Sequence, residues 1–150
     1  FGKKTQVCGI ASTTRVDEVD SCFKVPSRIN STWGGNIVDM VRATRYIEII
    51  EQERLLDNAR DMGEHLLAGL RSLAKPGGPV SNVRGRGLMC AFDLPSPEIR
   101  GNVVKAAMKD EHMLVLPCGN AGIRFRPVLD IDRGAIDDAL ARLARVLGKL

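Results

Sequence analysis

Apolar residues recur every three or four positions in two neighbouring stretches of the chain, and this spacing predicts two amphipathic helices. The first stretch covers residues 37–50 and the second covers residues 55–73. The sequence Lys-Pro-Gly-Gly-Pro at residues 75–79 ends the second helix, because proline and glycine do not continue helical geometry. The two helices are nearly continuous, with a bend expected near Glu53.

The chain before residue 37 is polar and rich in turn-forming residues. Residues 22–25 have the composition of a short extended segment, which ends at Pro26. The sequence Asn-Ser-Thr-Trp-Gly-Gly-Asn at residues 30–36 predicts a loop that also supplies capping residues for the following helix.

Beyond residue 79 short strands alternate with helices, in the order β-β-α-β-β-α. This order predicts a small α/β domain whose helices cover one face of a sheet. The predicted elements are strands at 80–83 and 87–94, a helix at 97–110, strands at 114–116 and 123–125, and a helix that Asp132 caps.

Composition and charge narrow the possible partners. The chain is 44% hydrophobic and 27% charged, as in a globular protein, and it has no apolar run near the ~20 residues of a membrane span. The net charge of +4 is spread among alternating acids and bases, so neither a nucleic acid nor a membrane is expected as a partner. The four cysteines form no C-x-x-C pair, which predicts no metal site and favours reduced thiols in a cytoplasmic protein. Because the first residue is Phe1 and not methionine, we expect a fragment.

Three segments carry candidate chemistry. Lys3 follows a glycine and can form a Schiff base with a carbonyl cofactor if it reaches into a cleft, although a surface lysine has the same local sequence. Thr32 precedes two glycines at a helix start, which suits either a phosphate site or a simple helix cap. Arg124 and Arg126 alternate around Phe125 on a strand, which suits capture of a carboxylate but is also common among surface arginines.

The sequence Arg-Gly-Arg-Gly at residues 84–87 has two interpretations. It can cradle an anion, but a turn that leads into a strand is favoured because glycine supplies the backbone freedom.

Taken together and in this order, the motifs resemble those of the class III (ω-) aminotransferases, which are fold-type-I pyridoxal-phosphate enzymes. They are Phe-Gly-Lys-Lys at 1–4, Asn-Ser-Thr-Trp-Gly-Gly-Asn at 30–36, Arg-Gly-Arg-Gly-Leu-Met at 84–89 and Ile-Arg-Phe-Arg-Pro at 123–127. The double lysine and Arg-Phe-Arg-Pro resemble the branch that contains lysine 6-aminotransferases and 4-aminobutyrate aminotransferases. The actinobacterial lysine 6-aminotransferases are the most similar.

The resemblance implies an α/β fold made of two parts. Residues 1–53 would be the end of the large cofactor-binding domain with its linking helix, and residues 54–150 would be the small C-terminal domain. It also implies a homodimer. The residues that hold the cofactor ring in the family would precede Phe1, so the chain by itself is expected to be inactive.

The resemblance also implies roles for individual residues. Lys3 would bind pyridoxal 5'-phosphate as a Schiff base and move protons during the reaction, with Lys4 as its rival for that role. Thr32 would bind the cofactor phosphate in the neighbouring subunit's site. Arg124 would bind the substrate carboxylate, with Arg126 as a supporting neighbour.

The expected reaction transfers the ε-amino group of L-lysine to 2-oxoglutarate and gives 2-aminoadipate 6-semialdehyde and L-glutamate. The alternatives are 4-aminobutyrate or another ω-amino donor with the same chemistry. A non-enzymatic alternative is a stand-alone dimerisation or binding module.

Overall fold

The computed structural model describes residues 9–29, 32 and 34–150. The packing of the chain divides it into two compact units, Phe1–Glu53 and Arg54–Leu150. The short break between the two long helices marks this division: α1 (Ile37–Gln52) ends just before it, and α2 (Leu55–Leu73) begins just after it. Arg54, the residue before α2, has a left-handed backbone with φ of 50°, so the helical hydrogen-bond pattern is interrupted there.

The first unit contains a short 3-10 helix, η1 (Thr14–Glu18), and helix α1. The extended segment predicted at residues 22–25 is wrong, since this part of the chain forms successive turns. The amides of Lys24 and Arg28 each bond to a carbonyl three residues earlier, which bends the backbone away from an extended path. Helix α1 begins where predicted, because the Asn36 side chain accepts a hydrogen bond from the Asp39 amide.

The predicted apolar stripe of α1 is present but uncovered within the described part of the unit. No residue of α1 is buried, and Ile37 is 76% exposed. The spacing of apolar residues therefore predicted the helix correctly, but it did not show what the apolar side chains contact.

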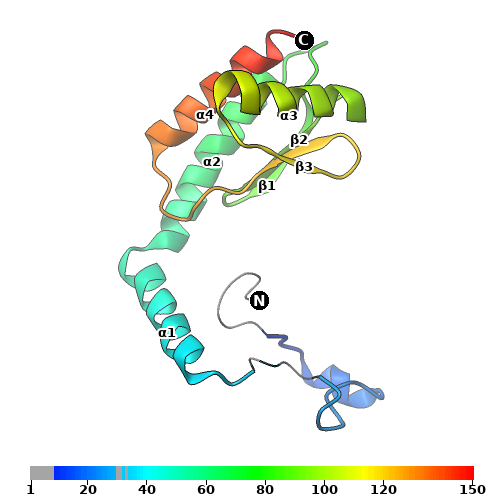
Figure 1. Ribbon diagram of the computed structural model, residues 1–150, viewed down its shortest axis with the longest axis vertical. Helices are drawn as coiled ribbons and strands as arrows, with labels where there is room; N and C mark the ends of the chain where they lie inside the picture. The colour runs from blue at the N-terminus through cyan, green and yellow to red at the C-terminus, as the bar shows by residue number, and fades with distance from the viewer. Residues whose placement is uncertain (1–8, 30–31, 33) are drawn as a thin grey trace. The chain divides into compact units, whose positions relative to one another are not determined.

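The second unit contains one antiparallel sheet with the strand order β1-β2-β4-β3, built from two neighbouring hairpins (Figure 1). The predicted order of elements is confirmed. The strands are β1 (Ser81–Arg86), β2 (Met89–Asp93), β3 (Leu116–Cys118) and β4 (Gly122–Phe125).

The strand boundaries differ from the prediction most clearly at β1 and β3. The turn expected at residues 84–87 is wrong, because Arg84 to Arg86 continue β1 and pair with β2. The chain reverses at Gly87, whose φ is 53°. Strand β3 begins at Leu116 and not at residue 114. It includes Pro117, which has no backbone N–H to donate, and this is tolerated because β3 is an edge strand of the sheet.

Three helices cover one face of this sheet: α2, α3 (Pro97–Glu111) and α4 (Arg133–Leu147) (Figure 1). Side chains that alternate along β2 and β4 point into the core, and Cys90, Phe92 and Ile123 are fully buried there. Ser96 and Asp132 cap α3 and α4 by accepting backbone hydrogen bonds, and the cap predicted at Asp132 is confirmed. None of the helices in the described part of the chain has the length and apolarity that a membrane crossing requires.

Candidate functional site

Of the three predicted site residues, Thr32 and Arg124 are among the residues that the structure describes. Lys3 and its rival Lys4 lie outside the described residues. Thr32 lies in a turn of the first unit, four positions before the cap of α1, and its side chain is exposed. Arg124 lies in β4 of the second unit. Thr32 and Arg124 therefore belong to different units.

The register of the sheet places Arg124 in a row that crosses its uncovered face. Arg124 pairs with Ala91 on one side and with Leu116 on the other, and Ala91 pairs in turn with Arg84. Ile123 and Phe125, the neighbours of Arg124 along the strand, point toward the helices. Alternation thus separates the guanidinium from the core, as the sequence pattern predicted.

The two arginines of this row have different partners. Arg84 donates hydrogen bonds to the Asp93 carboxylate (3.0 Å) and to the Asn82 carbonyl (2.9 Å). Hydrogen bonds from Asn82 and Arg84 lower the pKa of Asp93. Among residues 9–29, 32 and 34–150, no carboxylate pairs with Arg124 or Arg126. Arg84 is therefore neutralised within the sheet, whereas Arg124 and Arg126 keep their donors for another group.

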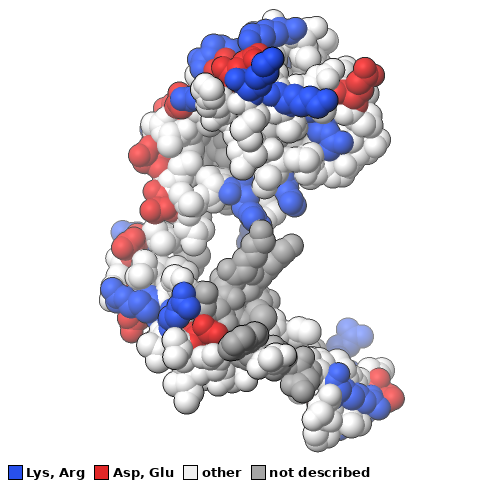
Figure 2. Space-filling model, viewed as in Figure 1, with Lys and Arg blue, Asp and Glu red and all other residues white. Residues whose placement is uncertain are grey.

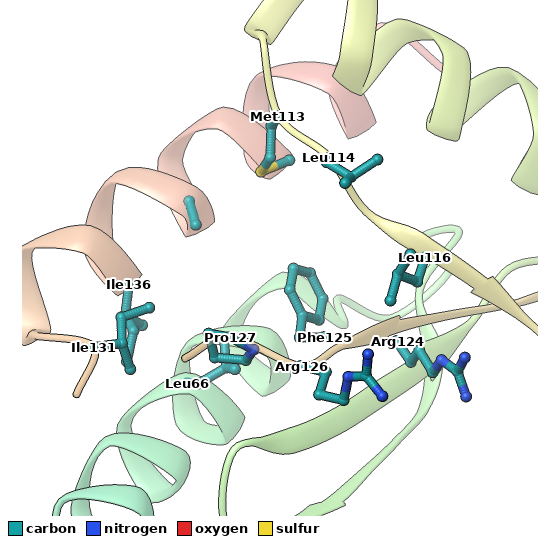
Figure 3. Close-up of a pocket in the computed structure, with 11 residues that line it drawn as sticks. Leu66, Met113, Leu114, Leu116, Arg124, Phe125, Arg126, Pro127, Ile131 and Ile136 are labelled. Carbon is teal, nitrogen blue, oxygen red and sulfur yellow. The ribbon is translucent and has the colours of Figure 1, made fainter. Parts of the chain in front are cut away.

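A pocket of about 420 Å³ lies beside Arg124 and Arg126. In Figure 3 the guanidinium groups of Arg124 and Arg126 extend to one side of the β4 segment, and the Phe125 and Met113 side chains of the apolar part of the pocket lie on the other side. An apolar cavity next to a charged group is the usual form of a small-molecule site. Its lining consists of Leu66, Met113, Leu114, Leu116, Arg124, Phe125, Arg126, Pro127, Ile131, Ile136 and Ala139.

Asn58 holds one wall of this pocket in place. Its amide group donates to the carbonyl of Leu129 (2.7 Å) and to that of Ile131 (3.0 Å), which ties the segment after β4 to helix α2. Buried or half-buried carbonyls need such partners. Asn58 thereby fixes where Pro127 and Ile131 lie.

Ion pairs over the rest of the unit join acids and bases that are close neighbours, and Figure 2 shows blue and red side chains next to each other. The Glu111 carboxylate at the end of α3 accepts hydrogen bonds from the Arg145 guanidinium (2.7 to 3.1 Å), which lower the pKa of Glu111. These pairs connect helices and leave the pocket beside Arg124 unaffected.

Thr32 is the residue expected from the resemblance to bind the cofactor phosphate, and it is among the described residues. Its hydroxyl is exposed, and Gly35 between it and the helix has φ of 78°, a backbone that favours glycine. Asn36 caps the α1 amides with its own side chain. An exposed hydroxyl beside a capped helix start can donate to a phosphate oxygen, so this segment fits the expected group.

Sequence reasoning missed Asn58 and the apolar wall of the pocket. Leu66, Ile131 and Ile136 come from α2, from the segment after β4 and from α4, and only tertiary packing brings them to Arg124. The one local signal is Pro127 directly after Arg126, because proline ends the strand and turns the chain toward α4.

The chain is similar along almost its whole length to enzymes that transfer amino groups from lysine. It is 50% identical to the L-lysine-epsilon aminotransferase of Amycolatopsis lactamdurans over 149 residues, which are 98% of this chain and 33% of that protein. The lysine aminotransferase of M. tuberculosis superposes with a TM-score of 0.86 at 48% identity, over 99% of this chain and 34% of that one. The chain thus spans about a third of the length of these relatives.

More distant members of the same group match less of the chain. The mitochondrial 4-aminobutyrate aminotransferase of Sus scrofa is 40% identical over 105 residues, which are 69% of this chain and 21% of that protein. The family described as "Aminotransferase class-III" matches residues 5–147. The chain belongs to the class-III aminotransferases.

Proposed function

We propose that this chain is part of an aminotransferase that transfers the ε-amino group of L-lysine to 2-oxoglutarate, giving 2-aminoadipate 6-semialdehyde and L-glutamate. The observation that carries the proposal is the likeness to L-lysine-epsilon aminotransferases, which reaches 50% identity over 98% of the chain. The likeness to 4-aminobutyrate aminotransferases is lower and covers less of the chain.

Arg124 is proposed to bind the carboxylate of the substrate. A guanidinium offers a planar fork of donors that matches the two oxygens of a carboxylate. Support comes from its position beside the pocket and from the lack of a carboxylate partner among the described residues, whereas Arg84 in the same row is occupied by Asp93. Arg126 is proposed as a second positive charge that favours the anion.

Class-III aminotransferases use pyridoxal phosphate, and the bound cofactor would take the amino group from the donor and pass it to the acceptor. Lys3 is proposed to hold the cofactor covalently through Nζ and, when released, to carry the proton between the reacting carbons. The Thr32 hydroxyl is proposed to donate to the cofactor phosphate in a neighbouring subunit of a homodimer. A cytoplasmic location is also proposed, and the free thiols of Cys22, Cys90 and Cys118 support it.

The donor is tested with a chimera in which this chain replaces the matching third of the Amycolatopsis lactamdurans enzyme. With L-lysine and 2-oxoglutarate we expect glutamate together with the cyclised semialdehyde. Transfer from 4-aminobutyrate without transfer from lysine would contradict the proposal. The unmodified Amycolatopsis enzyme serves as the positive control.

The role of Arg124 is tested in the same chimera with Arg124→Gln. Loss of charged hydrogen bonds of about 1.5–3 kcal/mol predicts a KM for 2-oxoglutarate that is roughly tenfold to a hundredfold higher. The visible absorbance of the bound cofactor should not change. Arg100→Gln, which removes a guanidinium from α3, is the matched control. An unchanged KM in Arg124→Gln removes this residue from the substrate site.

The role of Lys3 is tested by comparing two alanine variants in the chimera. Lys3→Ala should abolish the absorbance of the lysine-bound cofactor, whereas Lys4→Ala should retain it. The reverse result would assign the cofactor to Lys4.

A further inference from the structure

The face of the sheet that α2, α3 and α4 leave uncovered has an unbalanced charge. Alternation along β1 and along the β4 segment directs four arginines to this face: Arg84, Arg86, Arg124 and Arg126. In β1 the direction follows from Gly85, where a Cβ would lie 2.8 Å from the sulfur of Cys90 in the core. In the β4 segment, the guanidinium groups of Arg124 and Arg126 extend to the same side (Figure 3).

Strand pairing brings one acid to this face. The residues that β2 and β3 add to it are Met89, Ala91, Asp93, Leu116 and Cys118. The acid is Asp93, which is paired with Arg84 (3.0 Å). In the part of the chain that the structure describes, Arg86, Arg124 and Arg126 have no carboxylate partner. Four arginines and one carboxylate therefore leave three positive charges unbalanced on the face.

The register also gives the spacing between Arg86 and Arg124. Arg86 pairs with Met89, whereas Arg124 pairs with Ala91, so the two arginines are two strands and two residues apart. With the usual strand spacing and rise per residue, their Cα atoms are about 12 Å apart. The uncharged side chains of Met89 and Ala91 lie between them. A ligand of Arg124 would therefore experience Arg86 mainly through its charge.

We propose that the uncovered face guides the dianionic amino acceptor to Arg124 and disfavours the cationic amino donor, with Arg86 as a specificity-determining residue that acts through its charge. 2-Oxoglutarate has two negative charges at neutral pH, whereas lysine has one net positive charge. The same field therefore acts on the two substrates with opposite sign. This inference rests on the proposed function, which supplies the two substrates.

The expected effect of Arg86 is modest and depends on salt. A unit charge about 12 Å from a dianion changes its local concentration roughly two- to fivefold at about 0.01 M salt, if the effective dielectric constant lies between that of water and about half of it. For a substrate with one positive charge the change is in the opposite direction and is about 1.5- to 2-fold. At about 0.5 M salt the field is screened over this distance, so both changes should disappear.

The first test measures kcat/KM for each substrate in the chimera with the Amycolatopsis lactamdurans enzyme. At about 0.01 M salt, Arg86→Gln should lower kcat/KM for 2-oxoglutarate roughly two- to fivefold and raise that for L-lysine about 1.5- to 2-fold. Arg86→Lys keeps the charge and is the matched control. A misfolded variant would lower both values. Unchanged values, equal changes for both substrates, or changes that persist at about 0.5 M salt would overturn the proposal.

The second test measures the charge of the face in the full chain without any reaction of the substrates. Cys118 of β3 reports on this face, because a Cβ at its pairing partner Gly122 would lie 2.9 Å from the Cys118 sulfur and 2.9 Å from Oδ1 of Asp93. Strand spacing places Cys118 about 8 Å from Arg124. The ratio of its alkylation rates with iodoacetate and iodoacetamide reports the local potential, since accessibility and thiolate content affect both reagents equally.

Mass spectrometry gives this ratio for each thiol, and the exposed Cys22 of the first unit is the internal control. At about 0.01 M salt the ratio should be higher at Cys118 than at Cys22. Arg124→Gln combined with Arg126→Gln should lower it roughly two- to fivefold at Cys118 and leave Cys22 unchanged. A ratio at Cys118 that does not exceed that at Cys22, or that the double variant does not lower, would overturn the inference even where the chimera transfers the amino group of lysine. The failure of this inference is thus distinguishable from the failure of the proposed function.

Discussion

Replacement of Gly63 by alanine tests the close contact between α2 and the β1–β2 hairpin. Alanine is ordinarily favourable in the interior of a helix, by about 0.8–1.0 kcal/mol relative to glycine. At Gly63 the added methyl group would overlap the backbone of Gly87, which cannot rotate aside as a side chain can. Overpacking of this kind costs about 1–3 kcal/mol, and a backbone contact places Gly63 toward the upper end. The helical gain and the steric cost therefore oppose each other within one substitution.

Two other helical glycines separate these contributions. A Cβ at Gly101 in α3 would meet no atom within 4 Å, so Gly101→Ala should show the helical gain alone. A Cβ at Gly69 would meet the terminal carbons of Leu140, which can move, so Gly69→Ala should lie between the other two variants. The free energy of unfolding of Gly63→Ala should thus be lower than that of Gly101→Ala by about 1–3 kcal/mol, which is the steric term.

Urea unfolding followed by far-ultraviolet circular dichroism measures these differences in the full chain. Thermal unfolding should give the same order, with about 2–4 °C between variants for each kcal/mol. If Gly63→Ala is as stable as Gly101→Ala, the hairpin gives way at no cost, and the close approach of α2 to Gly87 does not constrain the fold.

Three further predictions concern the same unit. Asn58→Ala should lower the unfolding free energy by about 0.5–1.5 kcal/mol, because the Leu129 and Ile131 carbonyls lose their donor, and Asn102→Ala on the exposed side of α3 is the control. The pKa of Asp93 is lowered on folding, so its stabilisation is present above the ordinary value of 3.8 and is lost as the pH falls through the lowered value. Asp93→Asn should therefore be destabilised in urea at about pH 6 but match the wild type in acid, and a difference that persists in acid would exclude this cause. Phe92→Ala should lower the unfolding free energy by about 3–5 kcal/mol, because it empties the centre of the core, and a loss below about 1 kcal/mol would contradict that position.

The elements that the sequence predicted correctly are those governed by local interactions. Helix α2 has a strong apolar stripe and a Pro/Gly stop, and α4 has the cap at Asp132, so neighbouring residues suffice to place them. Strand β3 was displaced by two residues because its position is fixed by pairing with β4 across the turn and not by its own composition. The segment at 22–25 has apolar residues but no partner strand in the described part of the chain, and turns prevail there.

The candidate site was predictable only in part for a related reason. Alternation around Phe125 was enough to place Arg124 and Arg126 on one side of the strand. The alternation did not indicate that Asp93 forms an ion pair with Arg84. This ion pair distinguishes Arg84 from Arg124, which lies in the same row of the sheet. Whether a guanidinium is free to bind a ligand depends on the residues that strand pairing places beside it. A single sequence does not show which strands pair.

Helix α2 lines the Arg124 pocket and also passes the β1–β2 hairpin. Leu66 lies in the lining of the Arg124 pocket, whereas Leu67 and Arg71 lie beside the hairpin, in the lining of a groove that also includes Gly87. Consecutive residues of a helix point about 100° apart, so Leu66 and Leu67 face different parts of the sheet. The buried position of Leu66 and the close approach at Gly63 fix α2 both laterally and in its distance from the hairpin. The positions of the pocket wall and of the β1–β2 hairpin therefore both depend on the packing of a single helix.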